Sequence, residues 1–347
     1  MNRTLLHGIR VIELAGLAPV PHCGMVLADF GANVTVIEKP SRDGDLPVEQ
    51  RMAERKTLKS LDLKSPQDIE KLRQLCRTSD VLLDPYRPGV LEQLDLDPVK
   101  LLEENKGLIV CRLTGYGQTG PLAQEAGHDI NYVSITGLLP TTSGHSCPRP
   151  WPPVNLLADF AGGGLTAAFG IVAALLKREK NGGQGCIIDC SMAEGLSYLA
   201  SFVRRYHDIE HLWTQPYAAF SGDCPIYRTY KTKDDKWLAV GALEPKFSRN
   251  LFHVLGIDKD ISDVFADPAT VAIEMEEAFR TKTREEWMEL FAGKQACVTP
   301  VLDLDEAVQY GHNVARGNFT NEGNGSIPQP APRMYTKEEF KKLKSKL

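Results

Sequence analysis

Short apolar segments alternate with helical segments over the first two hundred residues, and this alternation constrains the fold more than any other feature. The segments at 8–14 (GIRVIEL) and 33–38 (NVTVIE) are rich in β-branched residues, and the apolar residues of 22–30 between them recur at helical spacing. Parallel strands need a long crossover connection, which is usually a helix. The pattern therefore predicts an α/β fold around a parallel sheet.

The same alternation continues to about residue 205, and the pattern then changes. Further strands are predicted at 81–84, 108–113 and 185–189, and helices at 66–78, 91–104, 162–180 and 192–205. After residue 215 we expect a strand pair at 225–232 and 236–241, helices near 246–255 and 283–291, and a strand at 297–302. We predict a large α/β domain over 1–215, a smaller α+β domain over 216–304, and a C-terminal segment and tail over 305–347.

Composition excludes several classes of protein. The chain has 347 residues, of which 42% are hydrophobic and 24% charged, as in ordinary soluble domains. The formal net charge is −5, so no basic excess indicates a nucleic-acid partner. Eight cysteines are too few for a disulfide scaffold. The uncharged stretch 160–176 contains four glycines and is shorter than the ~20 residues of a membrane span, so we predict a buried helix there.

Both ends of the chain carry information about location. The first residues show no apolar segment followed by a cleavage site, so no secretory signal is predicted and the thiols are expected to be free. The last three residues, Ser345, Lys346 and Leu347, match the Ser-Lys-Leu peroxisomal address. The alternative is a solvated basic helix that stops there. We expect a peroxisomal protein recognised by the import receptor, with a mitochondrial pool left open.

Two short motifs resemble known sites without their usual context. Residues 115–120 fit G-x-G-x-x-G, but Pro121 follows and no helix is predicted to open at the glycines, so nicotinamide binding is not expected. His207 and His211 fit the H-x-x-E-H zinc motif at a predicted helix end, and no third ligand follows. We interpret 115–120 as a loop and the histidines as solvated, and we predict no metal site.

Three polar residues are candidates for proton transfer. His128 precedes an apolar stretch and could serve as a general base near neutral pH, or simply cap a helix. Asp159, flanked by apolar residues just before the predicted helix at 162–180, is either an N-cap or a buried acid. Glu244 ends a predicted strand of the smaller domain and could be an ordinary surface carboxylate. None of the three is decisive alone.

Several segments together resemble the α-methylacyl-CoA racemases, which belong to the family III CoA-transferase superfamily. They are GIRVIELAGLAPVPHCGMVLADFGANVTVIEK, GYGQTGP, AGHDINY, NLLADFAGGG, VGALEP and ACVTPVL, and the resemblance runs from about residue 8 to about residue 332. It implies a large Rossmann-like domain, a smaller α+β domain and an interlocked homodimer whose active site lies between the domains. The chain ends soon after residue 332, before much of the C-terminal segment that the resemblance leads us to expect.

The resemblance also implies catalytic roles. His128 and Asp159 match the two catalytic residues, and Glu244 matches an assisting glutamate. They would invert the α-carbon of 2-methylacyl-CoA thioesters, with branched fatty or sterol side-chain acyl groups, by two-base proton transfer through an enolate. In the transferase branch the position of Asp159 forms an acyl anhydride and the histidine is absent, so His128 favours the racemase. The CoA-transferase remains the alternative, and an inactive acyl-CoA-binding protein is a third possibility.

Substrate contacts are implied less directly. Lys39 stands where the family has an arginine at the adenosine-phosphate end of CoA, and Arg87 matches a phosphate-facing arginine. Lysine lacks the bidentate fork, so this contact is expected to be weaker. A CoA-contacting stretch is matched by Leu61, Asp62, Leu63 and Lys64. Residues expected to surround the substrate beside His128 are Gly127, Asp129, Ile130, Asn131 and Tyr132. No separate cofactor is expected, because CoA is part of the substrate.

Overall fold

The chain forms two compact units. The computed structural model describes all residues except 1–4, 41–51, 145–148, 153, 323–324 and 345–347. The first unit comprises Met1–Leu139, Pro152–Ser201 and Pro330–Leu347, and the second comprises Pro140–Trp151 and Phe202–Gln329.

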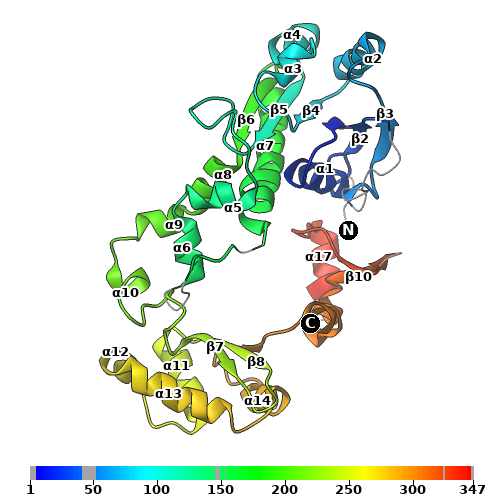
Figure 1. Cartoon of the computed structure of the whole chain (residues 1–347). Coiled ribbons are helices and arrows are strands. Elements are labelled where there is room, and N and C mark those ends of the chain that lie inside the picture. Colours follow the sequence, from blue (N-terminus) through cyan, green and yellow to red (C-terminus); the bar gives the residue numbers. More distant parts are fainter. Residues whose placement is uncertain (1–4, 41–51, 145–148, 153, 323–324, 345–347) are drawn as a thin grey trace. The chain divides into compact units, whose positions relative to one another are not determined.

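A six-stranded parallel sheet organises the first unit (Figure 1). Its strand order is β3-β2-β1-β4-β5-β6, and every neighbouring pair is parallel. The strands are β1 (Arg10–Leu14), β2 (Asn33–Glu38), β3 (Thr57–Ser60), β4 (Val81–Asp84), β5 (Ile109–Thr114) and β6 (Cys186–Ser191). The predicted α/β fold with a parallel sheet is confirmed.

The central strands form the core and the edges do not. All residues of β4 and β5 are buried, whereas all four residues of the edge strand β3 are exposed. Strands with helices on both faces are apolar throughout, which explains why β4 and β5 could be predicted. Three of the four residues of β3 (TLKS) are polar, and this strand was not predicted.

The helices predicted at 22–30, 66–78, 91–104, 162–180 and 192–205 are found with local corrections, whereas those at 129–134 and 337–344 were not predicted. The helices of the first unit are α1 (Pro19–Asp29), α2 (Pro66–Arg77), α3 (Val90–Gln93), α4 (Pro98–Glu104), α5 (Asp129–Ser134), η2 (Leu156–Leu165), α7 (Thr166–Lys180), α8 (Met192–Leu199) and α17 (Lys337–Lys344). Pro19 and Pro21 lie inside the first turn of α1, where a missing N–H costs nothing, so the predicted start at residue 22 was too late. The predicted helix 91–104 is broken, because Asp95 has a φ of 55° between α3 and α4.

The central helix begins earlier than predicted. A π-helical segment, η2, runs directly into α7, so Asp159 lies inside the helix and not at an N-cap before it. In the sequence Asp159 could be an N-cap, and the predicted helix therefore started after it, at residue 162. The stretch Leu156–Lys180 is long and apolar enough to cross a membrane by length and composition alone. In the first unit it packs against α1, α8 and β5, as expected of a core helix, although Leu165, Phe169 and Leu176 are exposed.

The second unit contains a three-stranded antiparallel sheet in the order β7-β8-β9. Its strands are β7 (Tyr227–Lys231), β8 (Trp237–Gly241) and β9 (Val298–Pro300), followed by a hairpin of β10 (Phe319–Glu322) and β11 (Gly325–Pro328). Its helices are α10 (Glu210–Trp213), α11 (Pro245–Leu255), α12 (Ile261–Ala266), α13 (Pro268–Phe279), α14 (Arg284–Phe291), α15 (Leu304–Gln309) and α16 (Gly311–Arg316). Two short helices, α6 (Leu138–Ser143) and α9 (Ser201–Arg205), span the unit boundaries. The core includes stacked Tyr230 and Phe279, with Trp287 against Phe279.

The unit boundaries differ from the predicted domain boundaries at 215 and 304. The second unit already begins at Phe202, because the Phe202 ring packs on Trp213 and Phe220. It also continues through Gln329, whose backbone N–H donates to Asn318. Of the predicted C-terminal segment 305–347, only the part from Pro330 onward belongs to the first unit.

Candidate active site

A cavity of about 310 Å³ lies at the carboxyl edge of the parallel sheet. Its walls include the residues that follow β1, β4, β5 and β6, namely Ala15, Pro85, Gly115 and Met192. Strand order reverses between β1 and β4, because β2 lies on one side of β1 and β4 on the other. Open α/β sheets bind ligands at such a switch point, because the loops there diverge and leave a crevice.

His128 reaches this cavity from a loop. After β5 the chain runs through turns until α5 begins at Asp129, so no helix opens at the glycines of residues 115–120. His128 has extended backbone at the N-cap position, and its backbone N–H donates to Asn131 Oδ1 at 3.1 Å. The residue is exposed and its side chain lines the cavity. An imidazole at such a position is accessible to substrate and to solvent protons.

Asp159 reaches the same cavity from the π-helical segment η2. The residue is only 9% exposed, and it lines the cavity together with His128. Its backbone N–H donates to Asp129 Oδ2 at 2.9 Å, so the helix is tied to α5 at this point. The structure thus brings a histidine and a nearly buried carboxylate to one cavity. The sequence positions of these two groups are 31 residues apart.

Tyr132 also forms part of the cavity wall. Its hydroxyl donates to Gly127 O at 2.5 Å, and its ring lies so close to Gly115 that a Cβ there would be 2.2 Å away. Burial, with a contribution from the Asp159 carboxylate, raises the pKa of Tyr132 to about 12. The Tyr132 hydroxyl therefore stays protonated across the physiological pH range and keeps its hydrogen bond to Gly127 O. It holds the loop before His128 in place.

Arg87 lies at the cavity rim. It follows β4, is exposed, and donates from Nη1 to Gln124 O at 3.1 Å. The loop begins at an ionic cluster in which the buried Arg112 donates from Nε to the buried Asp84 Oδ2 at 2.9 Å and from Nη1 to Oε1 of the exposed Glu92 at 2.7 Å. Burial raises the pKa of Asp84 to about 6. This cluster fixes the point at which the Arg87 loop leaves the sheet.

Other predicted contact residues lie near the same sheet edge but outside the cavity wall. Lys39 follows β2 and Leu61 follows β3, both at carboxyl ends of strands. Leu61 is 3% exposed, and its side chain packs in the core of the first unit. Asp62 accepts from the backbone N–H of Lys64 at 3.0 Å. Asp129, Ile130 and Asn131 also stay outside the wall, whereas Gly127 and Tyr132 are part of it.

Glu244 belongs to the second unit. It is exposed and forms the N-cap of α11, where its carbonyl accepts from the N–H groups of Phe247 and Ser248. The targeting residues Ser345, Lys346 and Leu347 lie outside the described residues. Within the part of the chain that the structure describes, no group of three His, Cys, Asp or Glu side chains is arranged to hold a metal ion.

Sequence patterns missed a buried ion pair beside the site. Lys56 Nζ donates to Glu13 Oε2 at 2.7 Å and to Pro21 O at 2.8 Å, and both charged side chains are almost fully buried. The pair connects β1 to the start of α1, and the first residues of α1 form part of the cavity wall. A glutamate inside an otherwise apolar strand (VIEL) was the available signal, since a buried carboxylate needs a partner.

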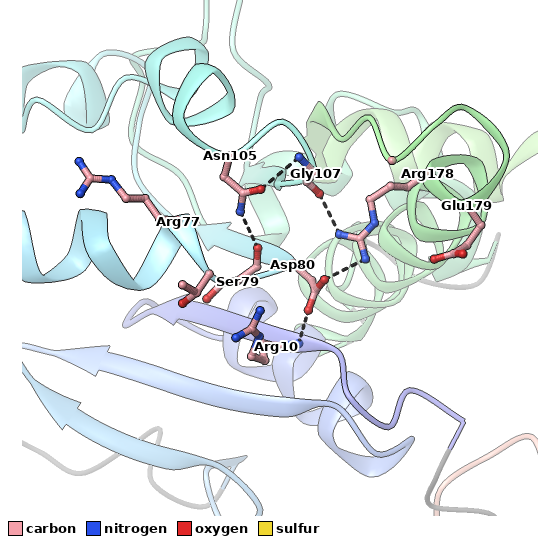
Figure 2. A pocket seen from close by; sticks show the side chains of 10 residues that line it. Arg10, Arg77, Ser79, Asp80, Asn105, Gly107, Arg178 and Glu179 are labelled. Carbon is pink, nitrogen blue, oxygen red and sulfur yellow. Dashed lines mark hydrogen bonds and ion pairs between the residues drawn. The ribbon is translucent and has the colours of Figure 1, made fainter.

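A second cavity, of about 330 Å³, lies at the amino edge of the sheet (Figure 2). Arg178 donates to Asp80 at 2.9 Å and to Gly107 O at 2.8 Å, and Asp80 also accepts from the Arg10 backbone N–H. Asn105 bonds to the backbone of Ser79 and Gly107. These groups bond to one another and join α7 to the strand starts, so we interpret this cavity as structural.

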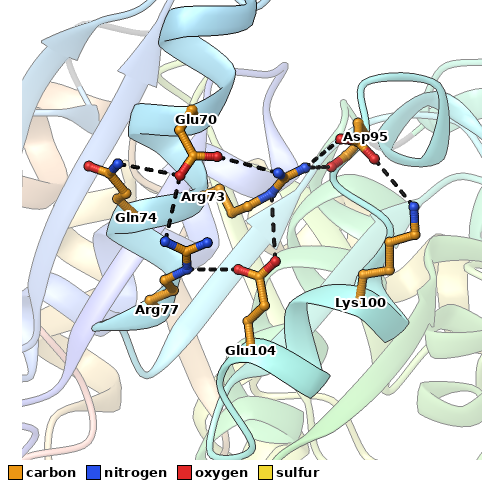
Figure 3. Close-up of polar contacts among 7 residues, drawn as sticks. All are labelled: Glu70, Arg73, Gln74, Arg77, Asp95, Lys100 and Glu104. Atoms are coloured by element: carbon orange, nitrogen blue, oxygen red, sulfur yellow. Dashed lines mark hydrogen bonds and ion pairs between the residues drawn. The ribbon is translucent and has the colours of Figure 1, made fainter.

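Beside it, ion pairs join α2 to α4 and the preceding loop (Figure 3). Arg73 donates to Asp95 Oδ2 at 2.7 Å and lies 3.8 Å from Glu104, and Arg77 donates to Glu104 at 2.8 Å. The hydrogen bond to Asp95 raises the pKa of Arg73 further. Exposed pairs of this kind contribute little to stability, because solvent screens the charges. They brace the outside of the first unit and do not bear on the site.

Comparison with known proteins identifies the family. The CoA-transferase family III model matches residues 6–345. A CaiB/baiF CoA-transferase family protein of Caenorhabditis elegans is 58% identical over 98% of this chain and 98% of its own. Alpha-methylacyl-CoA racemase of Homo sapiens is 44% identical over 94% of this chain and 86% of its own. A crystal structure of a hypothetical protein from Mycobacterium tuberculosis aligns with TM-score 0.77 and 26% identity, covering 95% of this chain and 93% of that one. The chain therefore belongs to CoA-transferase family III.

Proposed function

We propose that this protein inverts the α-carbon of 2-methylacyl-CoA thioesters whose acyl group is a branched fatty acid or a sterol side chain. The observation that carries this proposal is that His128 and Asp159 line one cavity from two different elements. The 44% identity to the human and mouse alpha-methylacyl-CoA racemases, over 94% of this chain, supports the same activity.

The chemistry needs two proton-transfer groups. A thioester carbonyl acidifies the adjacent C–H, so one group removes that proton and leaves an enolate. The second group then delivers a proton to the opposite face. Histidine and a carboxylate suit these roles, because each can act as acid in one direction and as base in the other. We assign one face to His128 and the other to Asp159.

The remaining groups would bind and stabilise. The enolate oxygen needs hydrogen-bond donors, and the first N–H groups of α5, beginning at Asp129, lack intrahelical acceptors. Glu244 would assist the proton transfer, as the resemblance to the racemases implies. Arg87 and Lys39 would bind the CoA phosphates, Arg87 through its planar fork of donors.

A CoA-transferase is the second candidate function. Succinyl-CoA:glutarate CoA-transferase of Homo sapiens is 26% identical over 96% of this chain, so the family also includes proteins with that name. In this case the carboxylate of Asp159, which lines the cavity, would attack the thioester carbonyl and break its C–S bond, so that CoA leaves as the thiolate and the acyl group stays on Asp159 as an anhydride. The C–H bond next to the carbonyl would then stay intact.

Incubation of one enantiomer of a 2-methylacyl-CoA in heavy water, followed by NMR, tests the proposal. We expect α-deuterium incorporation and loss of optical purity without any acceptor acid. Transfer of CoA between two acids with the α-proton retained would refute the racemase and establish the transferase. Binding of acyl-CoA with neither reaction would indicate an acyl-CoA-binding protein.

We further propose a homodimer. The exposed face of the central helix carries Leu165, Phe169, Val172 and Leu176, and Phe169 is 74% exposed. These residues recur at the spacing of one helical face, and such a continuous apolar stripe is typical of an interface. Light scattering after size-exclusion chromatography should give twice the 38.4 kDa chain mass, and Phe169→Glu should shift it toward the monomer. A monomeric native protein would contradict the proposal.

The terminal tripeptide supports a peroxisomal location. We expect removal of Ser345, Lys346 and Leu347 to leave an active protein outside peroxisomes. Import of a tagged protein without these residues would exclude the tripeptide as the address.

A further inference from the structure

Asp129 makes an unusual set of contacts beside the site. Its side chain is buried, with the residue only 4% exposed. Oδ2 accepts from the backbone N–H of Ala158 at 2.7 Å and from that of Asp159 at 2.9 Å. Both N–H groups lie in the first turn of η2, where a helix has no acceptors of its own. Asp129 therefore caps this helix from a position 29 residues upstream of Ala158.

The same residue is the direct neighbour of His128. Its backbone continues from the histidine into α5, while its carboxylate holds the backbone of Asp159. His128 and Asp159 are thus connected through the Asp129 side chain. We propose that Asp129 is a positioning residue that sets the separation between His128 and Asp159. The inference rests on the proposed racemase function and adds a role for the Asp129 side chain.

The two proton-transfer groups depend on Asp129 unequally. His128 is also held by its own helix, since its backbone N–H donates to Asn131 Oδ1 and its carbonyl accepts from Asn131. By contrast, the start of η2 loses the bonds from the N–H groups of both Ala158 and Asp159 when the Asp129 carboxylate is removed. A displacement of ~1 Å at a reacting group can cost ~100-fold in rate. The proton transfer on the Asp159 face should therefore suffer more than that on the His128 face.

Two substitutions separate this role from a general effect on folding. Asp129→Ala removes the acceptor, whereas Asp129→Asn keeps an oxygen that can accept both N–H bonds. We expect Asp129→Ala to lower kcat at least ~30-fold with KM for acyl-CoA within ~3-fold. Its α-deuterium exchange should fall mainly for the enantiomer whose proton faces Asp159. Asp129→Asn should restore kcat to within ~5-fold of the native enzyme.

Asp97→Ala is the matched control. Asp97 caps α4 by accepting from the Val99 N–H at 2.8 Å, so this variant also loses a carboxylate cap, and Asp97 does not line the cavity. Its kcat and its exchange on both faces should equal those of the native protein. Equal losses on both faces in Asp129→Ala, or kcat unchanged, would overturn the proposal.

A second measurement keeps the inference independent of the reaction. Hydrogen-exchange mass spectrometry on a peptide covering residues 156–161 reports the two amide groups directly. We expect loss of protection in Asp129→Ala and recovery in Asp129→Asn. Native protein that neither racemises nor exchanges the α-proton would overturn the proposed function, while this protection pattern would still test the contact. Unchanged protection in Asp129→Ala would overturn the positioning role itself.

Discussion

Replacement of Gly195 by alanine should loosen the first unit at the helix that carries Asp159. Gly195 on α8 faces Gly162 on η2 so closely that a Cβ at position 195 would lie 1.9 Å from the Gly162 carbonyl oxygen. A Cβ at Gly162 would in turn lie 2.7 Å from Leu196 N and Met192 O. The atoms in the way belong to the backbone, so no change of side-chain rotamer can relieve the clash.

The size of the effect follows from two opposing terms. Alanine favours a helix over glycine by up to ~1 kcal/mol. Overpacking of a rigid contact costs ~1–3 kcal/mol. Because the 1.9 Å contact must open by more than 1 Å to reach even 3.0 Å, we expect the upper part of this range. Gly195→Ala should therefore lose about 1–2 kcal/mol of unfolding free energy in the first unit, together with much of its kcat.

Gly170→Ala is the matched control for this prediction. Gly170 lies in α7, and its added Cβ would meet the Ile188 side chain at 3.8 Å (Cγ2) and 3.9 Å (Cδ1), which are ordinary contacts. The same chemical change should here gain ~0.5–1 kcal/mol, since only the helix preference operates. The two variants are thus expected to move in opposite directions.

Urea unfolding followed by far-UV circular dichroism measures both variants. All four tryptophans, at 151, 213, 237 and 287, belong to the second unit, so their fluorescence gives a separate reference transition. A Gly195→Ala protein as stable as the native one, beside a Gly170→Ala protein that behaves as expected, would refute the close backbone contact between η2 and α8.

Three further predictions concern charge. Burial raises the pKa of Asp84 to about 6, above the ~3.9 of an unfolded Asp. Ionisation of Asp84 should therefore reduce the stability of the fold as pH rises from about 4 to about 6. Urea midpoints measured across this range should fall less in Asp84→Asn than in the native protein. Hydrogen bonds from Arg284, and then from Lys236, lower the pKa of Glu306 to about 2. The Glu306 carboxylate therefore stabilises the fold above its unfolded pKa of ~4.3, and this contribution is lost as pH falls toward 2. Acid unfolding followed by tryptophan fluorescence should occur at higher pH in Glu306→Gln than in the native protein. Arg87→Ala should raise KM for acyl-CoA ~10-fold with a smaller change in kcat, and an unchanged KM would remove Arg87 from the CoA site.

Sequence patterns predicted the sheet because its buried strands differ strongly from their surroundings. The predicted strand at 33–38 and that at 81–84 match β2 and β4 residue for residue. The missing strand, β3, is stabilised by pairing with β2 and not by its own polar residues. Helix α13 was missed although Val271, Met275 and Phe279 are buried at helical spacing, so a signal existed there.

The candidate site was predictable only in part. His128 and Asp159 could be named from their segments and from the family resemblance, but their common cavity depends on the folded chain. Leu61 shows another limit, because the match of its segment to the family did not tell that its side chain packs in the core. Contacts such as that of the Asp129 carboxylate with the Asp159 N–H involve backbone groups, which leave no trace in residue patterns.

The glycine tract 162–164 explains why such backbone contacts gather at this site. A Cβ at Gly162 would lie 2.7 Å from backbone atoms of α8, one at Gly163 would lie 2.9 Å from Met192 Cγ, and one at Gly164 would lie 2.5 Å from His22 Nδ1 in α1. The helix is therefore enclosed by α1 on one side and α8 on the other, and these helices follow β1 and β6. The residues that follow β1 and β6 line the cavity. The close contacts of the glycine tract with α1 and α8 therefore also fix the Asp159 backbone relative to the cavity. Glycine weakens a helix by its conformational freedom, yet here its small size is what lets the helix carry a carboxylate to the sheet edge.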